Sequence, residues 1–298
     1  MNPIRLSHST LDKFLSCERL FQLDKLLEGA PEKEDYASTV FGTAFGIGVA
    51  TYMSTQNQDQ AIFKTWLAYS PVLEEKTKTE LSCIYSVLAA FPALDNLLLE
   101  WEVPTFEDKP AVELSFNLFI NENFYYVGYI DVTLQNKFTG KFAVLEVKTT
   151  SLGLIDLDPL YKNSGQAVGY SIVLDAIAGE EKAEYDVIYL VAQLNSKTLY
   201  STNIRTLPYT KTLRDRLDWF ISLGMDVQRL EQMLEYDVFP RRGRSCLQYM
   251  RPCKHLGTCH LRSLDRYREI PVDTINYQFK YDLDSIVAKH IKRTNIGE

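Results

Sequence analysis

The chain has 298 residues, of which 46% are hydrophobic, so it can bury a substantial core without covalent cross-links. Its net charge of -7 and its pI of about 5.3 exclude a strongly basic protein, so any nucleic-acid contact would depend on a local positive surface. We find no signal peptide, membrane-spanning run, internal repeat or phosphate-binding loop. This favours a reducing cytoplasm and places any ATP-driven motor on a separate chain.

The first third of the chain has the apolar spacing of helices. Ser7 or Ser9 is a suitable N-cap for a first helix that ends near Gly29. Three further helices are expected, at about 38–54, 59–69 and 76–91. The first of these three is rich in glycine, which indicates close packing against its neighbours.

The middle of the chain is dominated by β-branched and aromatic runs. Strands are expected at about 100–106, 110–120, 123–135 and 141–149, and again at 183–193 and 198–206. A long amphipathic helix is expected over Lys211–Leu234, and a short helical stretch near Leu283–Ile291. The pattern predicts a single α/β domain, in which a helical region (6–100), a sheet core (101–206), a helix with a cysteine lobe (207–262) and a tail (263–298) follow one another.

The most informative motif lies in the strand expected at 141–149. Glu146 and Lys148 are two residues apart, so both side chains face the same side of that strand. Asp131 lies in the preceding strand, and a turn between the two strands would bring the carboxylates together. Two carboxylates beside an ammonium group suit Mg²⁺ binding and a fixed positive charge. A surface ion pair gives the same spacing, but apolar neighbours on both faces favour a buried site.

Two further features accompany this motif. Glu113 lies on the alternating strand before Asp131 and is a candidate third carboxylate, although an exposed glutamate on a half-buried strand explains it as simply. Gln166 and Tyr170 are four residues apart, which places them on one face of a helix. Aromatic side chains such as Tyr161 are candidates for stacking on bases, although core packing is their commoner role.

The five cysteines form a second constellation. Cys83 lies in an apolar helical pattern and is expected to be an ordinary buried thiol. Three others, Cys246, Cys253 and Cys259, lie in a short basic segment that is suited to binding a metal. Zinc is one candidate, because His255 and His260 lie among the cysteines and four-coordinate thiolate sites suit it. The same segment offers a basic surface for DNA phosphates, formed by Arg241, Arg242 and Arg244.

These motifs resemble the PD-(D/E)XK nuclease superfamily and, within it, the RecB-like nucleases and their phage relatives. The similar segments are Leu6–Cys17, Gly128–Asp131, Leu145–Thr150 and Gln166–Tyr170, and the resemblance covers most of residues 6–260. It implies a restriction-endonuclease-like fold with a mixed β-sheet between helices. It also implies metal-dependent hydrolysis of DNA.

The resemblance assigns roles to the motif residues. It implies that Mg²⁺ or Mn²⁺ is bound by Glu113, Asp131, Glu146 and the main-chain carbonyl of Val147. Lys148 would orient the attacking water or stabilise developing charge on the phosphate. Gln166 and Tyr170 would lie beside the active site, in contact with DNA or with the catalytic residues.

The iron-sulfur members of the RecB-like group bind a 4Fe-4S cluster through one N-terminal and three C-terminal cysteines. The resemblance therefore implies a cluster held by Cys17, Cys246, Cys253 and Cys259, with Zn²⁺ as the alternative. The sequence departs from the family at two places. Six residues separate Cys246 from Cys253, where the family usually has two. Gly46 stands where many RecB-like nucleases have a metal-binding histidine.

The sequence therefore predicts a metal-dependent deoxyribonuclease. The resemblance favours an exonuclease that acts on DNA ends or single strands in recombination, repair or phage DNA metabolism, with a helicase or recombination partner in trans and no membrane. One alternative is a catalytically weak nuclease-fold protein that binds DNA or a partner, which Gly46 favours. The other is a structure-specific or restriction-type endonuclease that has the same site.

Overall fold

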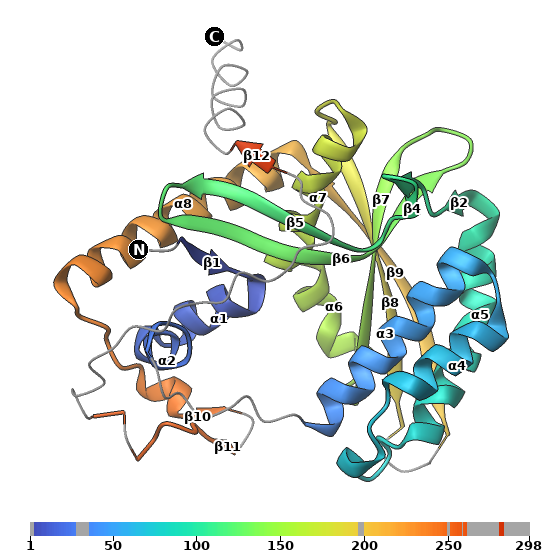
Figure 1. Ribbon diagram of the computed structural model, residues 1–298, viewed down its shortest axis with the longest axis horizontal. Helices are drawn as coiled ribbons and strands as arrows, with labels where there is room; N and C mark the ends of the chain where they lie inside the picture. Colours follow the sequence, from blue (N-terminus) through green and yellow to red (C-terminus); the bar gives the residue numbers. More distant parts are fainter. Residues whose placement is uncertain are drawn as a thin grey trace. The chain divides into compact units, whose positions relative to one another are not determined.

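The computed structural model describes residues 3–27, 36–195, 200–248, 251–257, 259–260 and 280–282 (Figure 1). The chain divides into two compact units. The sheet unit comprises residues 34–115 and 129–216, and the terminal unit comprises 1–33, 116–128 and 217–298. Strands β5 and β6 and helix α8 have residues in both units, at Val112–Asn121, Phe124–Asn136 and Leu213–Tyr236.

The sheet unit is built on a mixed β-sheet in which β6, β7, β8 and β9 are successive neighbours. Strand β6 pairs antiparallel with β7, β7 pairs parallel with β8, and β8 pairs antiparallel with β9. Short β2 pairs with β6, and β3 pairs with β4. The bounds are β2 Trp101–Glu102, β3 Thr105–Phe106, β4 Lys109–Pro110, β7 Phe142–Thr150, β8 Glu184–Leu194 and β9 Thr202–Thr212.

Helices lie on both faces of this sheet. On one face are α3, α4 and α5, with a 3-10 turn between α4 and α5 (Figure 1). Helices α6 and α7 form the crossover between parallel β7 and β8, and α7 contacts both of these strands. The bounds are α3 Ala37–Thr55, α4 Gln58–Ala68, η2 Pro71–Leu73, α5 Glu80–Glu100, α6 Leu154–Lys162 and α7 Gly165–Ala178. The fold is the restriction-endonuclease-like α/β architecture that the sequence predicted.

The main core of the sheet unit lies between the sheet and the layer of α3 to α5. Its members include Phe41, Phe45 and Leu145, which are fully buried. Gly48 of α3 allows this close packing, because a Cβ at that position would lie 2.8 Å from Val87 Cγ2 and closer still to Thr65. The close packing expected for the glycine-rich helix is therefore confirmed.

Helix α5 is long and apolar enough to span a membrane by length and composition, contrary to the expectation from sequence. Within the structure, however, it contacts α3, α4 and β9. Its Val87, Ala90, Phe91 and Leu94 are buried in the core of the sheet unit. This packing accounts for part of its apolar composition, because 39% of the apolar window is buried.

The terminal unit begins with β1, Ile4–Leu6, which pairs parallel with β6. Ser7 caps the next helix, because its side chain accepts a hydrogen bond from the Thr10 N–H. The first helix does not run on to Gly29 as expected. It breaks at Cys17, which is extended (φ -163°, ψ 110°). The segments are α1 His8–Ser16, α2 Glu18–Phe21 and the π-helix η1 Gln22–Leu26.

The rest of the terminal unit contains most of α8 and the cysteine segment. Short elements follow α8, namely η3 Gly243–Cys246, β10 Leu247–Gln248 and β11 Arg251–Pro252. Strand β10 pairs antiparallel with β11, and β12, Lys280–Asp282, pairs parallel with β5. The helix expected near Leu283–Ile291 lies outside the described residues.

Several expected bounds were wrong for local reasons. Helix α5 begins at Glu80 because Thr79 caps it, and it continues to Glu100. Strand β9 extends to Thr212, where the Asp215 carboxylate accepts from the Thr212 N–H at 2.8 Å and starts α8. The strand expected at 100–106 is two short strands, and helix α6 was not predicted.

Candidate active site

Asp131 and Glu146 come together on the adjacent antiparallel strands β6 and β7. Val132 of β6 is paired with Leu145 of β7. Asp131 precedes Val132 and Glu146 follows Leu145, so each acid lies one residue from this pair. The Val147 N–H donates to Asp131 Oδ2 at 2.7 Å, which ties the two strands together at the site. The expected hairpin arrangement of the two acids is therefore confirmed.

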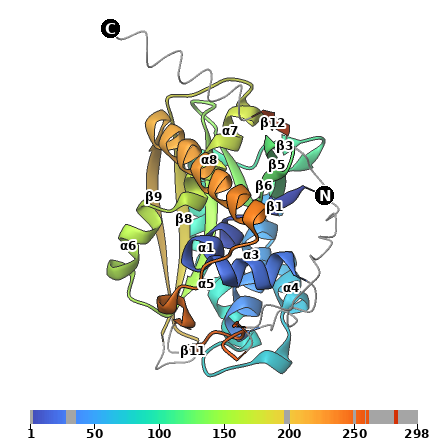
Figure 2. The same ribbon diagram turned by 90° about the vertical axis from the view of Figure 1, so that its left-hand side faces the viewer.

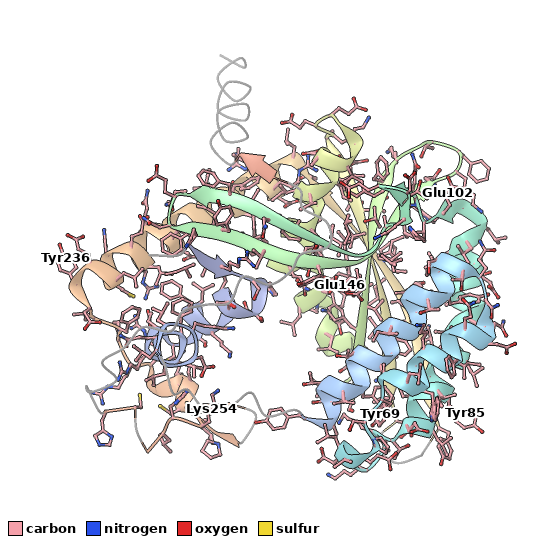
Figure 3. All side chains as sticks on the ribbon, viewed as in Figure 1. Tyr69, Tyr85, Glu102, Glu146, Tyr236 and Lys254 are labelled. Carbon is pink, nitrogen blue, oxygen red and sulfur yellow. The ribbon has the colours of Figure 1, made fainter. Side chains whose placement is uncertain are left out.

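Glu146 and Lys148 form an ion pair in which the carboxylate is buried. Glu146, labelled in Figure 3, is 1% exposed, and Lys148 Nζ lies 2.6 Å from its Oε1. The Glu146 Oε2 is also buried, yet it has no hydrogen-bond partner among the described residues. A solvated surface ion pair is therefore excluded. A buried carboxylate oxygen without a donor is expensive, and a bound cation would satisfy it.

Lys148 is held from a second direction by helix α7. Its Nζ donates to Gln166 Oε1 at 3.1 Å, and Gln166 Nε2 donates to the Tyr170 hydroxyl at 2.8 Å. The spacing of four residues places Gln166 and Tyr170 on the same face of α7, as expected. The hydrogen bonds form a continuous chain from Tyr170 through Gln166 and Lys148 to Glu146.

Glu113 stands at the start of β5 in an unusual backbone conformation. Its φ is 49°, in the left-handed region that a residue with a Cβ adopts only at an energetic cost. The residue is exposed, but desolvation of its carboxyl group and the nearby Asp131 raise its pKa to about 7. The structure therefore places Glu113 within electrostatic range of the other two acids.

The three carboxyl groups carry more negative charge than their surroundings can neutralise. Burial raises the pKa of Glu146 to about 7, with Lys148 opposing and Asp131 and Glu113 adding to the shift. Burial also raises the pKa of Asp131, although the Val147 N–H and Lys148 oppose it. Desolvation lowers the pKa of Lys148, but its carboxylate neighbours outweigh this effect and raise it overall. Lys148 is therefore a fixed cation at neutral pH.

This donor set fits a divalent cation. A cation would lower the carboxyl pKa values and would give Glu146 Oε2 a partner. As the side chains stand, however, no three histidine, cysteine, aspartate or glutamate residues in the described part of the chain are arranged as a metal site. The acids would have to converge further when an ion binds.

Gly46 lies on helix α3 with open space beside it. A Cβ built there would meet nothing within 4 Å. The position therefore contributes no ligand, and it is not kept as glycine by crowding.

The cysteine segment forms a pocket within the terminal unit. Cys17, Cys246, Cys253 and Cys259 all line this pocket, together with His255. Burial raises the pKa of Cys259, and Cys17 and Cys253 add to the shift. The structure therefore gathers the four predicted ligands in one place, although the absence of a ready metal site among the described residues applies here too. Cys83, in contrast, is fully buried in the sheet unit with its pKa raised to about 12 by burial.

The three arginines of the basic segment differ in what they contact. Arg242 donates from Nε and from an Nη to the carboxylate of buried Glu18, at 2.8 and 2.7 Å. Arg229 pairs with the same carboxylate. Arg241 and Arg244 are exposed and form no ion pair with a described residue. Arg242 therefore ties the C-terminal segment to the N-terminal helices of the terminal unit.

Reasoning from sequence missed residues that the tertiary fold brings to these sites. Tyr189 of β8 is in register with Glu146 of β7, and Glu18 and Asp24 anchor the cysteine segment. The strand register and long-range ion pairs carried no local signal. Tyr249 and Thr258 lie outside the described part of the segment.

The comparison with family models agrees with the geometry of the site. The family model described as the PD-(D/E)XK nuclease superfamily matches residues 5–260. No curated protein matches the sequence. Among solved structures, a protein named "putative exonuclease" from Eubacterium rectale is similar with a TM-score of 0.49 and 14% identity, over 91% of each chain. Because the family match spans most of its length, the chain belongs to the PD-(D/E)XK nuclease superfamily.

Proposed function

We propose that the chain is a Mg²⁺- or Mn²⁺-dependent deoxyribonuclease of the RecB-like type that removes nucleotides from DNA ends or single strands. Membership of a nuclease superfamily supports phosphodiester hydrolysis. The observation that carries the proposal is the buried carboxylate of Glu146. One of its oxygens contacts Lys148, and the other has no hydrogen-bond partner in the part of the chain that the structure describes.

The residues that would bind the metal are Glu113, Asp131, Glu146 and the Val147 carbonyl. Divalent ions held there would activate a water molecule and stabilise the leaving oxygen. Asp131 is already fixed by the Val147 N–H, which leaves its other carboxylate oxygen for this role. Because a proton and a metal ion compete for the same oxygens, the raised carboxyl pKa values predict weaker metal binding below neutral pH.

Lys148 would act on the reacting phosphate or on the attacking water. Its ammonium has three N–H donors, and Glu146 and Gln166 accept two of them. The third donor is directed by these two contacts and serves the substrate. Gln166 is a positioning residue for Lys148, and Tyr170 in turn orients the Gln166 amide.

The distinction between exonuclease and endonuclease is tested with linear and circular single-stranded DNA of the same sequence. An exonuclease degrades the linear form and leaves the circle intact, because the circle has no end. Cleavage of the circle would instead support the restriction-type or structure-specific alternative. Lys148→Ala is the control for contaminating nuclease in both assays.

Arg241 and Arg244 are proposed phosphate contacts, so substituting both should weaken DNA binding and flatten its salt dependence.

The second alternative, a catalytically weak protein that binds DNA or a partner, draws on Gly46. It predicts that wild type and Lys148→Ala both bind the linear substrate and leave it intact. The proposed enzyme cleaves the linear substrate, and the Lys148→Ala variant does not.

A helicase or recombination partner in trans is part of the proposal, because the sequence shows no phosphate-binding loop. A reducing compartment is also part of it, because the cysteines are free thiols.

We also propose that Cys17, Cys246, Cys253 and Cys259 bind a 4Fe-4S cluster. Their support is the shared pocket, which joins the N-terminal helices to the C-terminal segment. Anaerobic purification should give a brown protein with iron and sulfide in equal amounts, and Cys17→Ser should lose both. Cys83→Ser is the matched control, because Cys83 lies in the other unit. A colourless protein that contains zinc would support the zinc alternative with His255.

A further inference from the structure

Helix α6 is fixed against the sheet close to the active site. The Tyr209 hydroxyl on β9 donates to Asp158 Oδ1 at 2.5 Å, and Lys211 Nζ donates to the Lys162 carbonyl at the end of α6. A cation at this position also interacts favourably with the C-terminal end of the helix dipole. Figures 1 and 2 both show α6 beside the strands of the sheet. These two contacts hold the part of α6 from Asp158 to Lys162, which includes Tyr161.

Tyr161 is the aromatic residue that α6 presents to the site. Its ring stacks on Tyr189, with centroids 4.7 Å apart and an interplanar angle of 27°. Tyr189 is fully buried and is in register with Glu146 on the neighbouring strand. Tyr209 also packs edge-on against Tyr189, with centroids 5.9 Å apart. Tyr161 is thus held by its stack on Tyr189, and Tyr189 is the residue beside Glu146 on the neighbouring strand.

The hydroxyl group of Tyr161 is not used by the fold. The residue is half-buried, and its hydroxyl makes no hydrogen bond to any residue that the structure describes. Burial raises its pKa, with the ammonium of Lys148 opposing the shift, so the phenol is a neutral donor at neutral pH. A neutral donor close to a catalytic cation is well placed for an anionic oxygen.

We propose that Tyr161 is a substrate-binding residue whose hydroxyl donates a hydrogen bond to a non-bridging oxygen of the phosphodiester that is cleaved. The geometry supports this assignment, because the stacked ring positions the hydroxyl on the side of the sheet that carries Glu146 and Lys148. The inference rests on the proposed nuclease function. It differs from base stacking, in which the ring and not the hydroxyl would matter.

Tyr161→Phe tests the hydroxyl with little disturbance, because the variant keeps the stacked ring. We expect kcat/KM for linear DNA to fall ~10- to 100-fold in Tyr161→Phe, as for loss of a hydrogen bond to a charged group. Tyr161→Ala should lose no less. Tyr85→Phe removes a hydroxyl from helix α5, where the ring packs on Tyr200 and has no ring contact with a described residue of α6, and is the matched control. If Tyr161→Phe cleaves as wild type does while Tyr161→Ala is impaired, the ring alone matters and the proposal is overturned.

A stereospecific readout separates substrate contact from a structural effect. The two phosphorothioate diastereomers at the cleaved bond place sulfur, a weak acceptor, on one or the other non-bridging oxygen. Measured with Mn²⁺, which accepts sulfur better than Mg²⁺ does, wild type should disfavour one diastereomer, and Tyr161→Phe should reduce that preference. An unchanged preference would contradict the contact.

The same experiment separates this inference from the proposed function. Wild-type cleavage of the unmodified DNA, lost in Lys148→Ala, supports the nuclease. With that activity present, normal cleavage by Tyr161→Phe overturns only the role of Tyr161. If wild type does not cleave with either metal ion, both the function and the inference that rests on it fail.

Discussion

Lys148 Nζ lies 2.6 Å from Glu146 Oε1, and the second carboxylate oxygen of Glu146 is buried without a hydrogen-bond partner among the described residues. The pair is therefore only half satisfied by the protein. The carboxylate has a fixed cation on one side and a free ligand position on the other. This asymmetry is what a metal-binding role requires and what a purely structural ion pair would avoid.

The metal-free protein should lose stability as the pH rises. The pKa of Glu146 is raised from 4.5 to about 7 in the folded state, so the folded protein holds a proton that the unfolded chain releases. The free energy of unfolding should therefore fall between about pH 4.5 and pH 7, by roughly 3 kcal/mol for this group. Urea unfolding in EDTA measures the trend, Glu146→Gln should reduce it, and Mn²⁺ should oppose it. An equally steep decline in Glu146→Gln would assign the effect to other groups.

Two glycines of helix α3 should respond oppositely to alanine. Gly46 has open space, so Gly46→Ala should stabilise the protein by about 1 kcal/mol through better helix propensity and should keep activity. Gly48 faces Val87 and Thr65, so Gly48→Ala should destabilise it by about 1 to 3 kcal/mol. Thermal unfolding of the two variants gives the comparison. A loss of stability in Gly46→Ala would show that the position is crowded.

Asp24 should anchor the cysteine segment down to strongly acidic pH. Burial would raise its pKa, but hydrogen bonds from Lys13, His255 and Lys254 outweigh this and lower it from 3.8 to about 2. Its contribution is fully present above about pH 4 and is lost as the pH falls through 2. Asp24→Asn should cost about 2 to 4 kcal/mol at pH 7. Equal stability of the two proteins at pH 7 would contradict this role.

The Gln166 and Tyr170 side chains should have graded effects on catalysis. Gln166→Met removes an acceptor from Lys148 and should lower kcat by ~10-fold or more with a smaller change in KM. Tyr170→Phe should have a weaker effect, because Tyr170 acts on Lys148 through Gln166. Steady-state kinetics on one linear substrate gives both values. A larger loss in Tyr170→Phe than in Gln166→Met would indicate that Tyr170 contacts the substrate directly.

Much of the fold could be predicted from the sequence because the strands around Asp131 and Glu146 have clear β-branched patterns and a short turn between them. The same local patterns predicted the face shared by Gln166 and Tyr170. Helix α6 was missed, since Pro159 and a short apolar run give little helical signal. The break at Cys17 was also missed, because the apolar spacing continues through it.

The parts of the site that depend on tertiary structure could not be predicted. Arg242 lies in a basic segment that was expected to contact DNA, and its ion pair with Glu18, 224 residues away in the sequence, could not be predicted. The stack of Tyr161 on Tyr189 depends on the register of β7 and β8. The positive φ of Glu113 depends on how β5 begins beside its neighbours and is not encoded by a glycine.

The most direct test of the account is the single-turnover rate of cleavage of an end-labelled single-stranded DNA by wild type and Glu146→Gln, with Mg²⁺ or Mn²⁺ and with EDTA. The substitution keeps the shape of the side chain and removes the proposed ligand charge. We predict metal-dependent cleavage by wild type and a rate at least ~10³-fold lower for Glu146→Gln, with DNA binding retained. Equal rates for the two proteins, or cleavage by wild type that persists in EDTA, would contradict a metal-dependent site at Glu146.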